Sequence, residues 1–302
     1  MSRPVALVTG CSSGFGFLLA EPLARAGHTV YATMRDPDAR NAEPARTLRA
    51  LADQGLAVRV LPLDVTSDAQ VDAAVARIEK EEGRIDVLVN NAGVMFGGVT
   101  EALTAGEFDR QFQVNVVGLF RVTRAVLPAM RRQRSGLLVH LSSIVGRIAP
   151  PFFGAYVASK WAVDGLGESL RYELAPLGID SVIVEPAPFH TNLFAEATHP
   201  ADTARAAAYG PVGETPAQLF AAFDNMFATM KAETDPQLVV NAIVGLVGTP
   251  AGQRPLRTVV GAMHMGAATV NERTEDVGKE MLGMVGLGHL ENVATAKASL
   301  AT

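Results

Sequence analysis

The sequence has little cysteine, few histidines and no basic excess. Cys11 is the single cysteine among 302 residues, which excludes an internal disulfide and any multi-cysteine zinc or iron–sulfur site. The six histidines lack the spacing of a helical metal motif, so we expect no protein-held metal ion. With 26 Lys and Arg against 31 Asp and Glu, the net charge is −5, and we expect neither nucleic acid nor an anionic membrane as a partner.

Long hydrophobic runs are also missing. No stretch approaches the ~18 uninterrupted apolar residues of a membrane span, and residues 1–4 lead directly into an apolar run, which leaves no room for a signal peptide. Together with the cysteine count, these absences predict a cytoplasmic protein. Apolar side chains are plentiful, at 48% of the residues against 19% charged, which predicts a globular protein with a full core.

Short aliphatic runs alternate with longer helical patterns along the chain. Runs that are apolar throughout are typical of strands buried on both faces, and this alternation predicts a doubly wound α/β fold with a parallel seven-stranded sheet. No linker or repeat interrupts the pattern, so we interpret residues 1–302 as one domain. The predicted strands are Val5–Val8, Thr29–Thr33, Ala57–Leu63, Val87–Asn90, Leu137–Leu141, Ser181–Val184 and Thr258–Val260.

Two segments depart from the alternation. Residues 194–233 contain no strand candidate but carry a Phe and Met stripe at helical spacing, which predicts a helical insert that packs on the core and also forms a lid over an apolar substrate. Residues 263–302 form a C-terminal extension, predicted to be one helix and a loop. Its glycines and methionines favour subunit packing over a cap near the substrate entrance.

A glycine-rich turn follows the first predicted strand. Gly10, Gly14 and Gly16 lie between that strand and a helix, where glycines permit a tight turn and close approach of backbone N–H groups to a pyrophosphate. An ordinary turn between a strand and a helix does not need all three glycines. The spacing therefore predicts a dinucleotide site.

The end of the second strand bears on the choice of dinucleotide. An acidic residue there would bind the ribose 2′-hydroxyl of NAD, but the sequence has Met34 followed by Arg35, whose guanidinium suits a 2′-phosphate. We expect NADP(H) rather than NAD(H), with Ser12 as a second phosphate ligand. The alternative is that Arg35 pairs with Asp36 or faces solvent.

Tyr156 and Lys160 are one helical turn apart, so the phenol and the ammonium share a helix face. A nearby cation favours the phenolate and lowers the pKa of a tyrosine. We expect Tyr156 to exchange a proton with a carbonyl or alcohol oxygen.

In order, the segments TGCSSGFG (9–16), NNAG (90–93), YVASK (156–160) and PAPFHT (186–191), with Asp64, Asn115 and Ser143, resemble the short-chain dehydrogenase/reductase family. In detail they are most similar to NADP-linked hydroxysteroid and retinol dehydrogenases. The resemblance implies a Rossmann-type dinucleotide-binding domain and assembly as a homodimer or homotetramer.

The resemblance also implies roles for individual residues. Tyr156 is the general acid/base, Lys160 lowers its pKa and holds the nicotinamide ribose, Ser143 binds the substrate oxygen, and Asn115 positions a water molecule that relays protons. Ser142 is the weaker alternative to Ser143. The cofactor-binding residues implied are Gly10, Ser12, Ser13, Gly14, Phe15, Gly16, Arg35, Asp64, Val65, Asn91, Ala92, Gly93, Tyr156, Lys160, Pro186, Phe189 and Thr191.

Taken singly, the Asn and Ser residues have structural alternatives: strand-end hydrogen bonds for Asn91, a strand terminus for Ser143, and a buried helix kink at Asn115. The sequence also departs from the family pattern, with Pro186-Ala187 where Pro-Gly is usual. A Cβ at this position bears on the nicotinamide contacts expected of Pro186, Phe189 and Thr191.

The predicted substrate pocket contains almost no charge, which disfavours small anionic substrates and favours a lipophilic or aromatic ketone and its secondary alcohol. The sequence thus predicts an NADP(H)-dependent oxidoreductase that acts on a small carbonyl or alcohol compound. The alternatives are an NAD-linked dehydrogenase of the same family and a catalytically silent dinucleotide-binding regulatory protein. The predicted substrate residues are Ser143, Val145, Phe153, Phe96 and Phe194.

Overall fold

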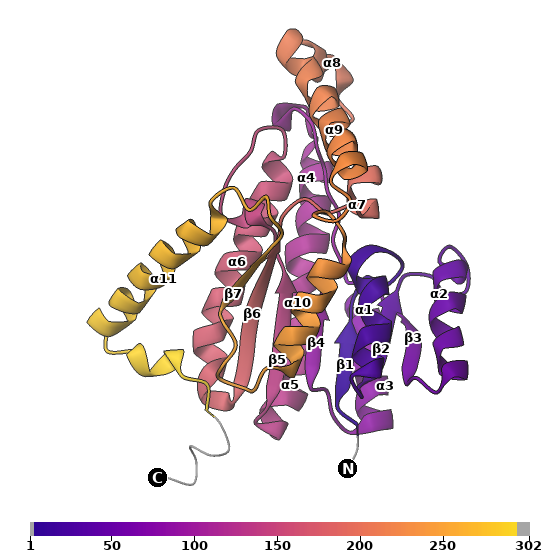
Figure 1. The fold of residues 1–302 in the computed structure, drawn as a ribbon, viewed down its shortest axis with the longest axis vertical. Coiled ribbons are helices and arrows are strands. Elements are labelled where there is room, and N and C mark those ends of the chain that lie inside the picture. The colour runs from indigo at the N-terminus through magenta and orange to yellow at the C-terminus, as the bar shows by residue number, and fades with distance from the viewer. Residues whose placement is uncertain (1–2, 295–302) are drawn as a thin grey trace.

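A computed structural model describes residues 3–294 as a layered α/β fold (Figure 1). Seven parallel strands form one sheet in the order β3-β2-β1-β4-β5-β6-β7, which confirms the predicted doubly wound sheet. The strand order reverses between β1 and β4, the switch point where such sheets bind ligands. The strands are β1 (Val5–Val8), β2 (Thr29–Met34), β3 (Val58–Pro62), β4 (Val87–Asn90), β5 (Gly136–Leu141), β6 (Ile179–Pro186) and β7 (Arg257–Val260).

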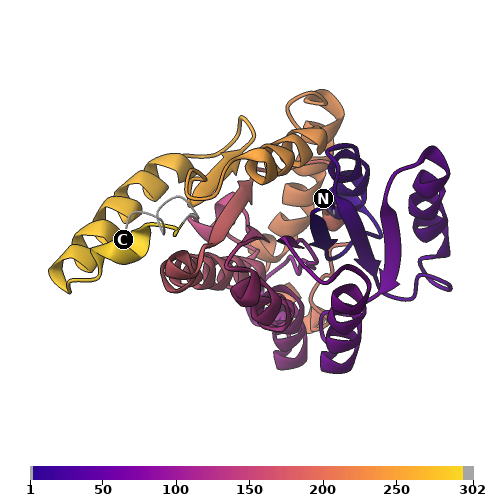
Figure 2. The same ribbon diagram turned by 90° about the horizontal axis from the view of Figure 1, so that it is seen from below.

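Helices cover both faces of the sheet (Figure 2). On one face α3, α5 and α6 pack their apolar sides against Leu7 and Leu88, and on the other face α1, α2 and α10 pack against Val8 and Val89. Neighbouring residues of one strand thus pack against helices on opposite faces of the sheet. This explains why the strands are apolar throughout instead of alternating between polar and apolar residues. The helices are α1 (Gly14–Arg25), α2 (Ala42–Arg49), α3 (Asp68–Glu82), α4 (Ala105–Phe112), α5 (Leu119–Gln133), α6 (Gly154–Leu174) and α10 (Gln237–Gly248).

Between α4 and α5 the chain forms a π-helical segment, Gln113–Gly118. Such widened turns occur where a helix is locally reshaped around a site. Asn115 lies within this segment and is 2% exposed. The π-helical segment sets the orientation of this asparagine.

The predicted insert is helical, with α7 (Asn192–Ala195), α8 (Thr203–Ala207) and α9 (Pro211–Thr229). These helices project beyond one end of the sheet, in orange at the top of Figure 1. Phe227 is buried, and Phe220 and Phe223 are half-buried, so the stripe faces inward as predicted.

The C-terminal extension forms α11 (Ala267–Met284) and a short 3-10 helix, Gly288–Glu291. The predicted helix is therefore present, and a second helical turn replaces part of the predicted loop. The remainder of the predicted extension, 295–302, lies outside the described residues. Within residues 3–294, no helix is both long enough and apolar enough to cross a membrane.

Candidate active site

A cavity of about 610 Å³ lies at the edge of the sheet where the strands end. Segments that follow β1, β2, β3, β4, β5 and β6 line it, because the carboxyl ends of parallel strands meet at one edge. α6 and α9 complete its wall. All of the predicted site residues line this cavity except Gly16 and Asn115, which lie behind it.

The glycine-rich turn forms one end of the cavity. Gly10 has a φ of +72°, and a Cβ there would lie 2.8 Å from the Cα of Ala92. A Cβ on Gly16 would collide with the Nδ2 atom of Asn91. Both glycines are therefore required for the turn to pack against the end of β4.

Asn91 holds the glycine-rich turn in place. Its Nδ2 donates hydrogen bonds to the carbonyl oxygens of Thr9, at 2.8 Å, and Gly10, at 3.1 Å. The structural alternative for Asn91 is thus observed together with its position in the cavity wall. Helix α1 begins at Gly14, and its first turn faces the cavity through Ser13 and Gly14, an arrangement that suits an anionic pyrophosphate.

Two guanidinium groups lie beyond the end of β2. Arg35 and Arg40 both line the cavity, and neither forms an ion pair within the described part of the chain, so Arg35 does not pair with Asp36. A tight turn brings them to the same cavity: Asp36 has a φ of +43°, and the Asn41 amide donates to the carbonyl oxygen of Arg35 at 2.5 Å. Sequence analysis missed Arg40, whose one signal is its position five residues after Arg35.

Together these groups fit a dinucleotide. The glycine-rich turn and the start of α1 would hold the pyrophosphate, and Arg35 and Arg40 would lie beside the adenosine ribose. Asp64 and Val65 line the same end, and the Asp64 carboxylate accepts hydrogen bonds from Thr66, which leaves its loop in a fixed shape.

Tyr156 and Ser143 lie deep in the cavity. Tyr156, on the first turn of α6, is 8% exposed, and burial raises the pKa of its phenol well above the ordinary value. The hydrogen bond from Ser143 opposes this rise because it favours the phenolate. The Ser143 hydroxyl also lies 3.3 Å from the carbonyl oxygen of Pro186, so it links the ends of β5 and β6.

The ammonium group of Lys160 is buried and forms a hydrogen bond to the main chain. Its Nζ atom donates a hydrogen bond of 2.7 Å to the carbonyl oxygen of Leu141. Burial lowers the pKa of Lys160 to about 8, against an opposing effect of Asp164. In this arrangement burial is the largest influence on the pKa of Tyr156, and the Lys160 ammonium lies 5.5 Å from the centre of its ring.

Ser142 and Asn115 have structural partners. The Ser142 hydroxyl donates to the carboxylate of Asp164, whereas the Ser143 hydroxyl faces Tyr156. The Asn115 amide donates to Val94, at 3.0 Å, and to Ser159, at 3.2 Å. Asn115 thereby ties the π-helical segment to the loop after β4 and to α6.

The departure at Ala187 is accommodated by a second glycine. Ala187 is 8% exposed, and its N–H pairs with the carbonyl oxygen of Val260 at 2.8 Å. A Cβ on Gly261 would lie 2.8 Å from the Cβ of Ala187. The Ala187 methyl therefore occupies space that Gly261 leaves open beyond the end of β7. Phe189 is 2% exposed and packs edge to face against Phe15, so its ring belongs to the core.

The other end of the cavity is aromatic. Phe153 packs against Phe220 and Phe223 of α9, at 5.7 and 6.2 Å between ring centres, and Phe194 lies 4.9 Å from Phe223. This cluster joins the insert to α6 and forms an apolar wall. The cavity wall also contains residues that sequence analysis missed, among them Arg110 on α4, Leu193 and Glu196 in and after α7, and Met265 before α11.

Comparison with known proteins places this fold and site in a family. Residues 4–202 match the model of the short chain dehydrogenase family. The chain belongs to this family, whose members are NAD(P)-dependent oxidoreductases that act on CH–OH and C=O groups.

Several relatives are well defined. The chain is 40% identical over 192 residues to a 3-ketodihydrosphingosine reductase of Bacteroides thetaiotaomicron, and the match covers 64% of this chain and 66% of that protein. It is 43% identical over 196 residues to human 17-beta-hydroxysteroid dehydrogenase type 1, with 63% of this chain and 58% of that enzyme covered. The matched part thus spans less than two thirds of either relative.

A solved structure extends the likeness beyond the matched segment. An actinorhodin polyketide ketoreductase variant with NADPH superposes with a TM-score of 0.71 and 30% identity, over 88% of this chain and 99% of that one.

Proposed function

We propose that this protein is an NADP(H)-dependent oxidoreductase that interconverts a lipophilic or aromatic ketone and its secondary alcohol, with Tyr156 as general acid/base. The observation that carries this proposal is the group of Ser143, Tyr156 and Lys160 in a cavity that is basic at one end and aromatic at the other.

Each residue has a chemical task in this proposal. A nicotinamide dinucleotide held by the glycine-rich turn and Arg35 would supply or accept the hydride when bound. In ketone reduction, the Tyr156 hydroxyl gives its proton to the carbonyl oxygen. The Ser143 hydroxyl donates a hydrogen bond to the same oxygen and stabilises its developing negative charge. Lys160 holds the ribose and supplies positive charge beside the phenol, and Asn115 positions the water molecule through which protons are relayed.

The preference for NADP(H) over NAD(H) is supported by Arg35 and Arg40, which are free to bind a 2′-phosphate, and by Ser12 in the same wall. A ketoreductase of similar fold is described with NADPH. A lipophilic substrate is supported by the aromatic wall, which offers apolar surface that such a substrate would bury. The names of the two relatives, a ketodihydrosphingosine reductase and a hydroxysteroid dehydrogenase, agree with it.

We also propose a homodimer or homotetramer. Phe120 on α5 and Trp161 on α6 are 46% and 50% exposed, which leaves two large apolar side chains on this face of the sheet for a subunit contact. Light scattering coupled to size exclusion would measure the mass of the assembly, and a monomer would contradict this part of the proposal.

The direct test follows cofactor oxidation with NADPH and NADH side by side, against a panel that contains aromatic ketones, long-chain ketones and hydrophilic keto acids. We expect turnover of the apolar ketones with NADPH. Higher kcat/KM with NADH would indicate an NAD-linked dehydrogenase instead. Tight NADPH binding without turnover of any ketone or alcohol would support the catalytically silent alternative.

A further inference from the structure

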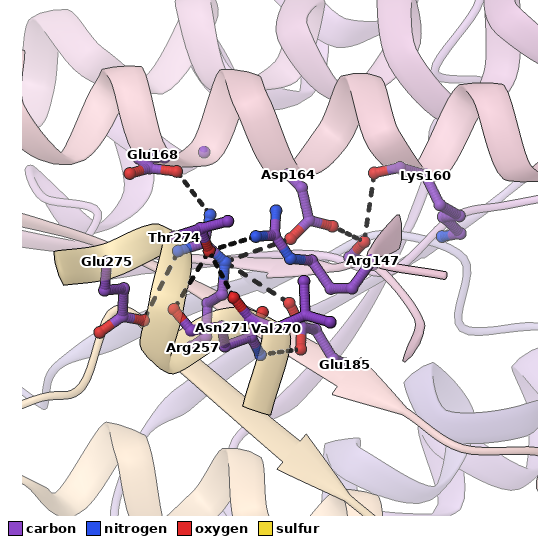
Figure 3. Close-up of polar contacts among 12 residues, drawn as sticks. Arg147, Lys160, Asp164, Glu168, Glu185, Arg257, Val270, Asn271, Thr274 and Glu275 are labelled. Carbon is purple, nitrogen blue, oxygen red and sulfur yellow. Dashed lines mark hydrogen bonds and ion pairs between the residues drawn. The ribbon is translucent and has the colours of Figure 1, made fainter. Parts of the chain in front are cut away.

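A second polar cluster lies buried beside the candidate active site, between α6, β6, β7 and α11. Its centre is Arg257, the first residue of β7, whose side chain is 1% exposed (Figure 3). None of its members lines the cavity. The Arg257 cluster consists of Arg257, Asp164, Glu168, Glu185, Asn271 and Glu275.

Arg257 is surrounded by carboxylates. Its Nη2 atom donates to Glu168 at 2.5 Å. Its Nε atom lies 3.4 Å from an oxygen of Asp164 and 3.5 Å from one of Glu185, and its Nη1 atom lies 3.5 Å from Glu275. One guanidinium thus serves four acidic side chains that come from three different elements.

This arrangement is a poor source of stability. The side chains of Asp164 and Glu185 are 2% and 0% exposed, so two carboxyl groups removed from water share one cation with two further acidic side chains. Burial and the proximity of Asp164 raise the pKa of Glu185 well above its ordinary value. Apolar side chains of similar size often serve a buried site at least as well as charged ones. The connections of the cluster point to a different role.

Asp164 connects the Arg257 cluster to α6, which carries Tyr156 and Lys160, and to the loop after β5, which carries Ser142 and Ser143. It lies one turn after Lys160 on α6, and its carboxylate accepts a hydrogen bond from Ser142, the neighbour of Ser143. The Ser142 hydroxyl also lies 3.3 Å from the carbonyl oxygen of Lys160. The loop packs so closely that a Cβ on Gly146 would collide with the Asp164 carboxylate. Asp164 therefore fixes the distance between the loop that carries Ser143 and the turn of α6 that carries Lys160.

Glu185 makes a second connection. It precedes Pro186, whose carbonyl oxygen lies 3.3 Å from the Ser143 hydroxyl. The Glu185 carboxylate accepts a hydrogen bond of 2.5 Å from Asn271 of α11 and faces Arg257. Arg257 thus contacts Asp164, which holds the loop after β5, and Glu185, which lies next to Pro186 at the end of β6.

Helix α11 completes the cluster from outside. Besides Asn271 and Glu275, it contributes Thr274, which accepts a hydrogen bond from Arg147 of the loop after β5 (Figure 3). The C-terminal helix is thereby tied to the loop after β5 through Thr274, to Glu185 through Asn271 and to Arg257 through Glu275.

We propose that Arg257 is a positioning residue, which acts through Asp164 and Glu185 to hold Ser143 and Lys160 in register for proton transfer, with Asn271 of α11 as its support. The inference rests on the proposed roles of Ser143 and Lys160.

The test compares R257M and R257K with R254M as the matched control. Arg254 is a half-buried residue whose side chain is 10% exposed, and it pairs with Asp180 near the same strand, but this pair contacts neither Ser142 nor Pro186. Titration with NADPH counts the folded sites, and kcat is expressed per site. We expect R257M to lose at least about tenfold in kcat per site, R257K to recover part of it, and R254M to lower only the thermal midpoint.

A second measurement needs no substrate. The ¹⁵N resonance of the Lys160 ammonium, assigned with K160M, is followed as a function of pH. In R257M, Asp164 loses its neutralising partner, and its charge raises the pKa of Lys160, so we expect a rise of at least about half a unit. In R254M we expect no change. This measurement is informative even if the wild-type protein reduces no ketone.

A wild-type kcat per site in R257M, together with an unshifted Lys160 resonance, would show that Arg257 only stabilises the fold and would overturn the proposal. If R257M does not fold, N271A takes its place, since it removes the α11 donor to Glu185 and leaves Arg257 intact. For N271A we expect a fall in kcat per site of about threefold with unchanged NADPH binding. An unaltered kcat and Lys160 resonance would contradict the proposal equally.

Discussion

The Nζ atom of Lys160 lies 5.5 Å from the centre of the Tyr156 ring. It is close enough to interact with a phenolate, yet its hydrogen bond goes to the carbonyl oxygen of Leu141. Because burial also raises the pKa of Tyr156, the phenol carries its proton at neutral pH in this arrangement. A protonated Tyr156 is the form that ketone reduction requires.

Replacement of Tyr156 by phenylalanine tests the proton donor. Y156F should lower kcat/KM for ketone reduction by about 100- to 10,000-fold, because only the transferable proton is removed. NADPH binding, measured by fluorescence, should remain. Y209F is the control, since the Tyr209 hydroxyl pairs with Glu101 at 2.6 Å and Tyr209 does not line the cavity. A wild-type rate in Y156F would refute the assignment.

Replacement of Arg35 by alanine tests the choice of cofactor. Loss of a charge-assisted hydrogen bond costs about 1.5–3 kcal/mol, so R35A should raise KM for NADPH by about 10- to 100-fold and leave KM for NADH nearly unchanged. Steady-state kinetics with both cofactors provides the measurement. The control is R46A, on the exposed side of α2 with 76% of its side chain accessible. An equal rise in KM for NADPH and NADH would show that Arg35 does not bind the 2′-phosphate.

Truncation of Phe223 tests the aromatic wall. F223A should raise KM for an apolar ketone by about 10- to 100-fold, because a ketone that fully buries the phenyl ring gains about 1.5–3 kcal/mol from it, and should change KM for acetone little. V212A, at the exposed start of the same helix α9, serves as the control. A uniform loss across both ketones would indicate damage to the fold rather than to a substrate contact.

Glu185 should make stability depend on pH. Its pKa is raised in the folded protein, so between the unfolded and folded values the native state binds more protons than the unfolded chain. The free energy of unfolding should therefore fall as the pH rises from the unfolded pKa of Glu185 to its folded pKa, by about 1.4 kcal/mol for each unit between them.

Urea unfolding at a series of pH values checks this dependence. E185Q removes the titration and keeps an acceptor for Asn271, so its stability relative to the wild type should grow as pH rises. E280Q, exposed on α11, should follow the wild-type curve. Parallel curves for E185Q and wild type would contradict the prediction.

The strands and the main site were predictable because their signals are local. Buried parallel strands are continuous apolar runs, so Val5–Val8 and Val87–Asn90 were predicted with their observed bounds, and no predicted strand end was more than two residues away from the observed one. Gly10 and Tyr156 meet in one cavity because both lie near ends of parallel strands, and the topology follows from the alternation of elements.

The other features of the site depend on contacts between residues that lie far apart in the sequence. Nothing near Arg257 in the sequence announces that it will meet Asp164 and Asn271, and its contacts depend on how α11 lies against β7. The direction of the Tyr156 pKa likewise depends on burial, which residue spacing on a helix does not report. The π-helical segment around Asn115 was foreseen only as the alternative of a buried helix kink, because a single asparagine does not specify how the helix is reshaped.

Ala187 and Gly261 share a volume that admits only one methyl group. This constrains the order in which the two positions can change during evolution. A side chain gained at 261 first requires the loss of the one at 187, and it must also tolerate a φ of +107°. A lineage that acquired Ala187 is therefore committed to glycine at 261, and the two sites should vary together among close relatives even though 74 positions separate them.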